Sequence, residues 1–143
     1  MTASRLAPGD ADALLFDLGR VVLNIDFSKA LACWAGHAGC TPADIAARWA
    51  VNETYHHHER GTISEEAFFD ELRRGLGISI SDTQFLEGWN AIFAGEMDGI
   101  APLLARAARH LTLYVYSNTN RAHVAHFTQI HAETLKPFRE LYY

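Results

Sequence analysis

Polar side chains that could carry out chemistry follow two apolar stretches of the chain. Asp17 comes directly after residues 13–16, and Ser117 and Asn118 come directly after residues 111–116. If both stretches are neighbouring parallel strands, their carboxyl ends open on one edge of the sheet, and the three side chains should meet there. A carboxylate at such an edge serves as a nucleophile or a metal ligand. A hydroxyl, an amide and a helix N-terminus beside it form a cradle for a phosphate group.

The elements that would position these side chains follow from the pattern of apolar and capping residues. Continuous apolar runs at 13–16 and 111–116 are typical of strands buried on both faces, and residues 138–143 indicate a further strand. The long stretch between the first two strands has helical spacing. Capping residues, prolines and glycines predict helices over 29–38, from 42 to 51 or 52, from 62 to 75 or 77, from 81 to 93, over 98–110 and over 121–131.

The order strand, several helices, strand, helix, strand predicts an α/β protein with a parallel sheet. Residues 12–26 and 111–143 are expected to form the sheet core. Residues 27–110 are expected to form a helical insertion together with the helix that returns to the core. So long a crossover between parallel strands requires part of it to leave the sheet as a sub-domain of its own.

Composition and charge exclude several classes of protein. With 49% hydrophobic and 20% charged residues, the 143-residue chain is expected to fold rather than stay disordered. Its net charge of −5 argues against nucleic-acid binding through phosphate contacts. No signal peptide begins the sequence and no apolar run approaches the ~18 residues of a membrane span, so no membrane partner is expected. Cys33 and Cys40 are interpreted as small apolar residues in a reducing compartment, which predicts a cytoplasmic protein.

Residues 15–22, with the sequence Leu-Phe-Asp-Leu-Gly-Arg-Val-Val, resemble the first motif of the haloacid dehalogenase (HAD) superfamily. Residues 117–120, Ser-Asn-Thr-Asn, resemble its second motif, and the helical insertion resembles the helical C1-type cap of the family. Residues 58–64 are similar to a cap segment of sugar-phosphate phosphatases, in particular of the α-glucose-1-phosphate phosphatase-like branch. The resemblance covers nearly the whole chain from Ala13 and implies a HAD-like, Rossmann-type sheet.

This resemblance assigns roles to the polar residues at the strand ends. Asp17 would be the nucleophile that forms an aspartyl-phosphate and would also bind Mg²⁺, with the backbone carbonyl of Gly19 as a second ligand. Ser117 and Asn118 would bind the transferring phosphoryl group. The implied activity is hydrolysis of a phosphomonoester, with a small phosphorylated metabolite such as a sugar phosphate as substrate and Mg²⁺ as cofactor.

Further residues are candidates for substrate contact or for the core. Arg20 directly follows the first motif, where it either meets an anionic substrate or is an ordinary surface charge. His58 is a candidate for the substrate pocket, although residues 56–58 are not expected to bind one metal ion because adjacent helical residues do not share a face. We expect the three tryptophans in the core of the cap and two later histidines on a surface helix: Trp34, Trp49, Trp89, His123 and His126.

The chain departs from the superfamily pattern at several points. Most superfamily phosphatases have a second aspartate at the position of Gly19, where it protonates the leaving group, whereas dehalogenases usually have a bulky aromatic residue there. The superfamily has a third motif, a lysine that holds the phosphoryl group and the nucleophile. Lys136 lies 19 positions after Ser117, too close to be this motif lysine if a helix, a strand and a loop come between. A fourth motif of the superfamily, an acidic pair that completes the Mg²⁺ site, is missing too, because the acids after Asn120 are Glu133 and Glu140.

The sequence therefore predicts the front portion of a HAD phosphatase, with an incomplete sheet. Strand 13–16 would form an exposed apolar edge, and we expect self-association through it. We also expect the 143-residue chain to lack meaningful phosphatase activity. Two alternatives stay open: a non-catalytic HAD remnant or interaction module, and another HAD reaction such as haloacid dehalogenation or phosphomutase chemistry.

Overall fold

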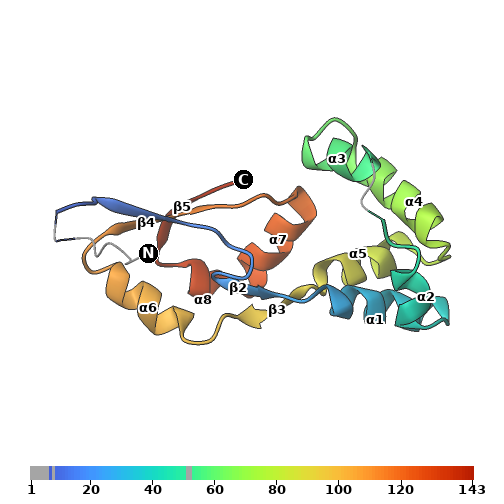
Figure 1. The fold of residues 1–143 in the computed structure, drawn as a ribbon, viewed down its shortest axis with the longest axis horizontal. Coiled ribbons are helices and arrows are strands. Elements are labelled where there is room, and N and C mark those ends of the chain that lie inside the picture. Colours follow the sequence, from blue (N-terminus) through green and yellow to red (C-terminus); the bar gives the residue numbers. More distant parts are fainter. Residues whose placement is uncertain (1–6, 8, 51–52) are drawn as a thin grey trace, which may run out of the picture.

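The structure is a computed structural model that describes residue 7, residues 9–50 and residues 53–143. In chain order the elements are β1 (Ala13–Phe16), β2 (Leu23–Ile25), α1 (Phe27–Ala38), α2 (Pro42–Ala46), α3 (Glu53–Glu59), α4 (Glu65–Leu76), α5 (Asp82–Asn90), β3 (Phe93–Glu96), α6 (Ile100–Ala107), β4 (Thr112–Tyr116), α7 (Arg121–Ile130), α8 (Ala132–Leu135) and β5 (Phe138–Tyr142). Figure 1 shows an elongated molecule with a sheet at one end and helices α1–α5 at the other.

The main sheet is parallel and has the strand order β1-β4-β5. All three strands were predicted, and the α/β class is confirmed. The expectation that β1 is buried on both faces is wrong, because β1 lies at the edge of this sheet and Leu15 is 66% exposed. The exposed apolar edge is therefore present in the structure, whereas association through it stays a prediction.

A second, two-stranded sheet joins the two ends of the molecule. Strands β2 and β3 pair antiparallel, with Ile25 opposite Phe93, and the Asp26 N–H donates to the Ile92 carbonyl at 2.8 Å. The sequence placed residues 92 and 93 on a helix, but α5 ends at Asn90. Pairing with β2 thus decides the conformation of these residues, as is common for short strands whose propensity is weak.

Each predicted helix begins within three residues of its expected start. Asp26, Ser64 and Ser81 are the N-caps of α1, α4 and α5, and each side chain accepts a backbone N–H of the first turn. Helix α2 is shorter than predicted and ends at Ala46, because Arg48 and Trp49 form the tighter hydrogen bonds of a terminal turn. The sequence predicted neither α3 nor α8, and the helix predicted over 121–131 corresponds to α7. No helix in the described part of the chain is long and apolar enough to cross a membrane.

The buried side chains form two clusters. One lies among the helices α1, α2, α4 and α5, where Trp34 is 1% exposed and stacks on Phe85 with 4.8 Å between ring centroids. Trp49 and Trp89 also pack in this cluster, which confirms the tryptophans as core residues. The other cluster lies between the main sheet and helices α6 and α7. The boundaries between a 12–26 and 111–143 core and a 27–110 insertion stay a prediction, since Phe93 packs against both clusters.

Candidate functional site

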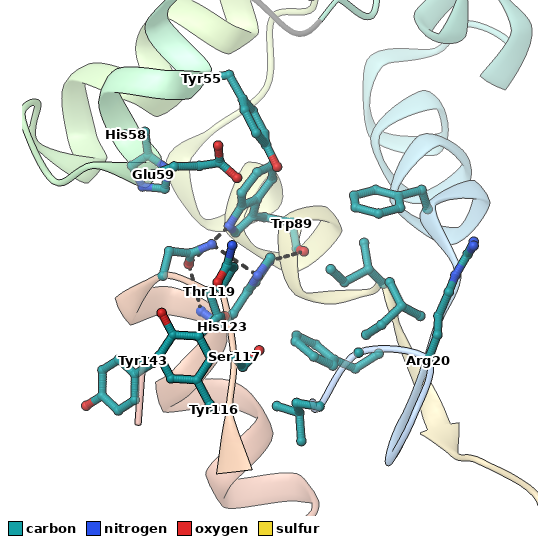
Figure 2. Close-up of a pocket in the computed structure, with 18 of the residues that line it drawn as sticks. Arg20, Tyr55, His58, Glu59, Trp89, Tyr116, Ser117, Thr119, His123 and Tyr143 are labelled. Atoms are coloured by element: carbon teal, nitrogen blue, oxygen red, sulfur yellow. Dashed lines mark hydrogen bonds between the residues drawn. The ribbon is translucent and has the colours of Figure 1, made fainter. Parts of the chain in front are cut away.

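Two adjoining recesses lie at the carboxyl ends of β1 and β4. The smaller has a volume of about 500 Å³ and is lined by Leu15, Phe16, Asp17, Gly19, Tyr116, Ser117 and Asn118. The larger has a volume of about 820 Å³ and extends from the same loops to helix α3 (Figure 2). Because the two recesses share Gly19, Ser117 and Asn118, they form one continuous candidate site.

Asp17 is placed in this site by the pairing of β1 with β4. Phe16 lies opposite Val115, so the residue after each strand emerges at the same edge of the sheet. The Asp17 side chain is exposed, and its Oδ1 accepts the Leu18 N–H at 2.7 Å. This bond orients the carboxylate, and Asp17 is among the residues that line the smaller recess. The predicted meeting of Asp17 with the loop after β4 is therefore present.

A tight turn follows Asp17 and fixes the backbone around Gly19. The Leu18 carbonyl accepts the N–H groups of Val22 and Leu23, each at 2.9 Å, and the Arg20 N–H donates to the Leu23 carbonyl at 2.7 Å. Since these bonds lie on both sides of Gly19, its position in the recess is set by the turn and does not depend on a side chain.

Gly19 and Arg20 lie at the centre of this turn and differ in backbone conformation. Arg20 has a φ of 59°, a left-handed conformation that costs a non-glycine residue roughly 1–2 kcal/mol. Such strain concentrates at functional sites. Gly19 is not in that region, and a Cβ added to it would meet only the Ile25 Cγ1 at 3.5 Å. Neither backbone nor space demands glycine at position 19, so the absence of an acid there is not imposed by the fold.

The loop after β4 contributes the other predicted residues. The Ser117 N–H donates to the Tyr142 carbonyl at 3.0 Å, which extends the β4–β5 pairing up to the site. Ser117 is half-buried and Asn118 is exposed, and both line the two recesses. A serine hydroxyl and an asparagine amide can each donate a hydrogen bond to an anion, and both residues line the smaller recess together with Asp17.

The N-terminus of α7 does not offer the open cradle that was expected from its position. The Ala122 N–H donates to Oε2 of Glu65 at 3.1 Å, and the His123 N–H donates to Oδ1 of Asn120 at 3.0 Å. Glu65 comes from α4, so a carboxylate of the helical region already occupies the place where an anion would bind. An incoming phosphate would have to displace it or use the Ser117 and Asn118 side chains alone.

Helix α3 provides the opposite wall of the larger recess. Figure 2 shows Tyr55 and Glu59 reaching from α3 toward the loop that carries Thr119. The ring of His58 stacks on Phe68 with 4.0 Å between centroids, and burial lowers the pKa of His58, so this imidazole is neutral at neutral pH. His58 therefore lines the pocket as the sequence suggested. Arg20 also lines it and is exposed, and its contact with an anionic substrate stays a prediction.

His123 is a site residue that the sequence assigned wrongly. It was expected on a helix surface, but it is 8% exposed and stacks on Trp89 with 4.9 Å between centroids. Its Nε2 lies 3.0 Å from the Trp89 carbonyl, and its Nδ1 lies 3.1 Å from Nδ2 of Asn120. Burial lowers its pKa to about 4, so the ring is neutral, with Nε2–H donating to the carbonyl and Nδ1 accepting from the amide. The sequence signal that indicates its burial is the spacing of four residues between His123 and Phe127, which places both on one face of the helix.

The oxygen atoms of Asp17 and Gly19 fit a magnesium ion whose other ligands come from a substrate phosphate and from water. The Asp17 carboxylate and the Gly19 carbonyl are oxygen ligands of the kind that Mg²⁺ prefers, and Mg²⁺ often takes one or two carboxylates plus phosphate oxygens and water. Glu133 pairs with Lys136 at 3.6 Å, and Glu140 accepts the Tyr142 hydroxyl at 2.8 Å. Neither acid lines a recess, and Lys136 lies before β5, so none of the three supplies a missing motif residue.

No model of a known protein family matches the sequence. The structure, however, is similar to solved structures of HAD proteins. The HAD family enzyme BT-2542 from Bacteroides thetaiotaomicron, solved in complex with magnesium and inorganic phosphate, has a TM-score of 0.71 and 23% identity, over 92% of this chain and 67% of that one. A protein described as a predicted HAD-like family hydrolase, from Porphyromonas gingivalis, has a TM-score of 0.66 and 20% identity, over 92% and 66% of the two chains. A Thermotoga maritima protein provisionally named a beta-phosphoglucomutase gives 0.52 and 18%, over 92% and 61%.

These similarities confirm the fold that the motifs predicted. The chain has the HAD-like α/β fold, with its helical insertion included in the match, which covers 92% of the residues. The chain spans about two thirds of the length of these two HAD proteins.

Proposed function

We propose that this chain carries the nucleophile and phosphoryl-binding residues of a HAD-type phosphatase that acts on a small phosphorylated metabolite such as a sugar phosphate. The observation that supports this is the placement of Asp17 and Ser117 at the ends of adjacent parallel strands, in one recess. The HAD enzyme BT-2542, which shares this fold, was solved with magnesium and inorganic phosphate.

The chemistry would use the Asp17 carboxylate as the nucleophile. One of its oxygens attacks phosphorus, the ester P–O bond breaks, and the alcohol leaves after taking a proton from water or from the substrate itself. Water then attacks the aspartyl-phosphate, which releases inorganic phosphate and restores the carboxylate. The Ser117 hydroxyl and the Asn118 amide donate to the phosphoryl oxygens through both displacements. Mg²⁺, held by Asp17 and the Gly19 carbonyl, would neutralise charge on the phosphoryl group.

The larger recess suits a hydroxyl-bearing leaving group. Its volume of about 820 Å³ lies within the range of small-molecule sites. Tyr55, His58 and Glu59 on α3 supply donors and acceptors, and Trp89 supplies an apolar face. Arg20 at the mouth would favour a substrate with negative charge. These features support a sugar phosphate over a purely apolar phosphoester.

The exposed edge of β1 supports a second proposal, self-association. Leu15 is 66% exposed at the end of the three-stranded sheet, and an unpaired apolar edge is prone to pair with another strand. This surface lies beside Asp17, so an associated copy would also change the access of solvent to the smaller recess.

Beryllium trifluoride with Mg²⁺ tests the proposed nucleophile without requiring turnover, because it forms an aspartyl-phosphate-like adduct with a reactive carboxylate. We expect a bound fluorine-19 NMR signal in the wild-type chain and its loss in Asp17→Asn. Asp12→Asn is the matched control, since Asp12 is another exposed acid beside β1. Absence of the signal from the wild type, or its persistence in Asp17→Asn, would contradict the assignment of Asp17.

A further inference from the structure

Three metal-ligating side chains of different chemistry lie together outside the pocket, on the helical end of the molecule. Cys33 and His37 are four positions apart on one face of α1, and Glu87 lies on α5. The ligand atoms of all three lie within 4.8 Å of one another. His37 Nε2 lies 2.9 Å from Oε2 of Glu87. None of the three lines a recess of the phosphate site.

We propose that Cys33, His37 and Glu87 form a zinc-binding site. A thiolate, an imidazole and a carboxylate are the ligand types that tetrahedral Zn²⁺ combines in proteins, whereas Mg²⁺ does not select sulfur. With Zn–S and Zn–N bond lengths of about 2.3 and 2.0 Å, the ligand atoms of a tetrahedral site lie about 3.4–3.6 Å apart. The distance of 2.9 Å between His37 and Glu87 is shorter than this value, and all the ligand atoms lie within 4.8 Å of one another. The tetrahedral separation therefore falls between these two limits.

The adjustment that remains falls on side chains that are free to move. The Glu87 side chain is 62% exposed and that of His37 is 30% exposed, so both can change rotamer at low cost. Cys33 is half-buried and supplies the fixed anchor of the site. Binding would break the Cys33 S–H bond, release that proton to solvent and form a sulfur–zinc bond. The thiolate and the carboxylate would then balance the charge of Zn²⁺, and water would occupy the fourth position.

The two helices that carry these ligands are held rigidly against each other. The Trp34 Nε1–H donates to the Phe85 carbonyl at 2.9 Å, and the rings of Trp34 and Phe85 are stacked. Gly88 allows this close approach, because a Cβ there would lie 2.3 Å from Trp34 Nε1. Trp34 directly follows Cys33 and Gly88 directly follows Glu87, so the packing holds the backbones of both ligands in place without the metal.

Cobalt(II) tests this site with a spectroscopic signature that other histidines cannot give. Protein without an affinity tag is titrated with Co²⁺, and we expect a thiolate-to-cobalt absorption band in the near ultraviolet that added Zn²⁺ removes. Cys33→Ser should lose the band. His37→Ala and Glu87→Gln should weaken Co²⁺ binding by more than about tenfold, since even the loss of an outer-shell partner costs that much.

Cys40→Ser is the matched control, because Cys40 is the other half-buried free cysteine and lies at the end of the same helix. It should keep the band at wild-type affinity. Glu87→Gln changes an exposed side chain, so its circular dichroism spectrum should match that of the wild type and separate ligand loss from unfolding. A band that survives Cys33→Ser, a band lost equally in Cys40→Ser, or Co²⁺ binding without any thiolate band would overturn the proposal.

Discussion

His123 links the helical region to the sheet region, and its titration should make the stability of the protein depend on pH. Its ring donates to the Trp89 carbonyl of α5 and accepts from Asn120 beside the loop after β4. Burial lowers its pKa to about 4, compared with the ordinary value of 6.5. The folded state therefore excludes a proton that the unfolded chain binds once the pH falls below 6.5.

The size of the effect follows from these two pKa values. The stability contributed by the neutral ring is complete above pH 6.5 and is lost as the pH falls toward 4. Between pH 7 and pH 5 the linkage relation gives a loss of about 2 kcal/mol in the free energy of unfolding. His123→Gln removes this titration, and the glutamine amide can still donate to the Trp89 carbonyl.

The assay is urea denaturation of both proteins at pH 7, 6 and 5. We expect the difference in unfolding free energy between wild type and His123→Gln to shift by about 2 kcal/mol over this range, with the wild type losing more. His110→Gln, which replaces an exposed histidine after α6, is the matched control for the removal of a histidine that is not buried. If the His123→Gln difference is constant with pH, the ring is not held neutral by burial and the reasoning fails.

Three other predictions follow from the site, the sheet edge and the helix packing. The 143-residue chain should not turn over p-nitrophenyl phosphate, because it lacks the motif lysine and acidic pair, and turnover that Asp17→Asn abolishes would disprove this. The wild type should sediment as a dimer or larger species at micromolar concentration and Leu15→Lys as a monomer, because the charge blocks pairing at the exposed β1 edge; a monomeric wild type would count against self-association. Gly88→Ala should lower the free energy of unfolding by about 2–3 kcal/mol, because its methyl group would overlap the buried Trp34 ring. Gly36→Ala on α1, where the methyl group meets nothing within 4 Å, should raise it by up to about 1 kcal/mol, and equal effects in urea denaturation would show that the packing is misjudged.

Features that depend on nearby residues could be predicted from the sequence. The apolar run before Asp17 predicted β1, and the glycines at 75 and 77 predicted the end of α4, which begins three residues after its expected start at residue 62. The same local logic placed Asp17 and Ser117 at a shared sheet edge, because only the strand assignments were needed.

Features that depend on distant partners could not be predicted. The burial of His123 depends on the carbonyl of Trp89, 34 residues earlier in the chain. The occupation of the α7 N-terminus by Glu65 is a contact across 57 residues. Strand β3 lacks a strong strand signal of its own and forms because Phe93 meets Ile25. In each case the deciding partner is supplied by tertiary packing, which local periodicity does not encode.

The β2–β3 ribbon has a consequence for how such a molecule can be remodelled. The chain leaves the sheet region at Ile25 and returns at Phe93, and these two residues are direct neighbours in an antiparallel pair. A tight hairpin turn could therefore join the same two points, as it joins ordinary antiparallel strands. All five helices from α1 to α5 thus occupy the position of a hairpin loop (Figure 1). Loop tips of this kind tolerate insertion and deletion, so this helical region could be exchanged, enlarged or removed while the strands around Asp17 keep their register.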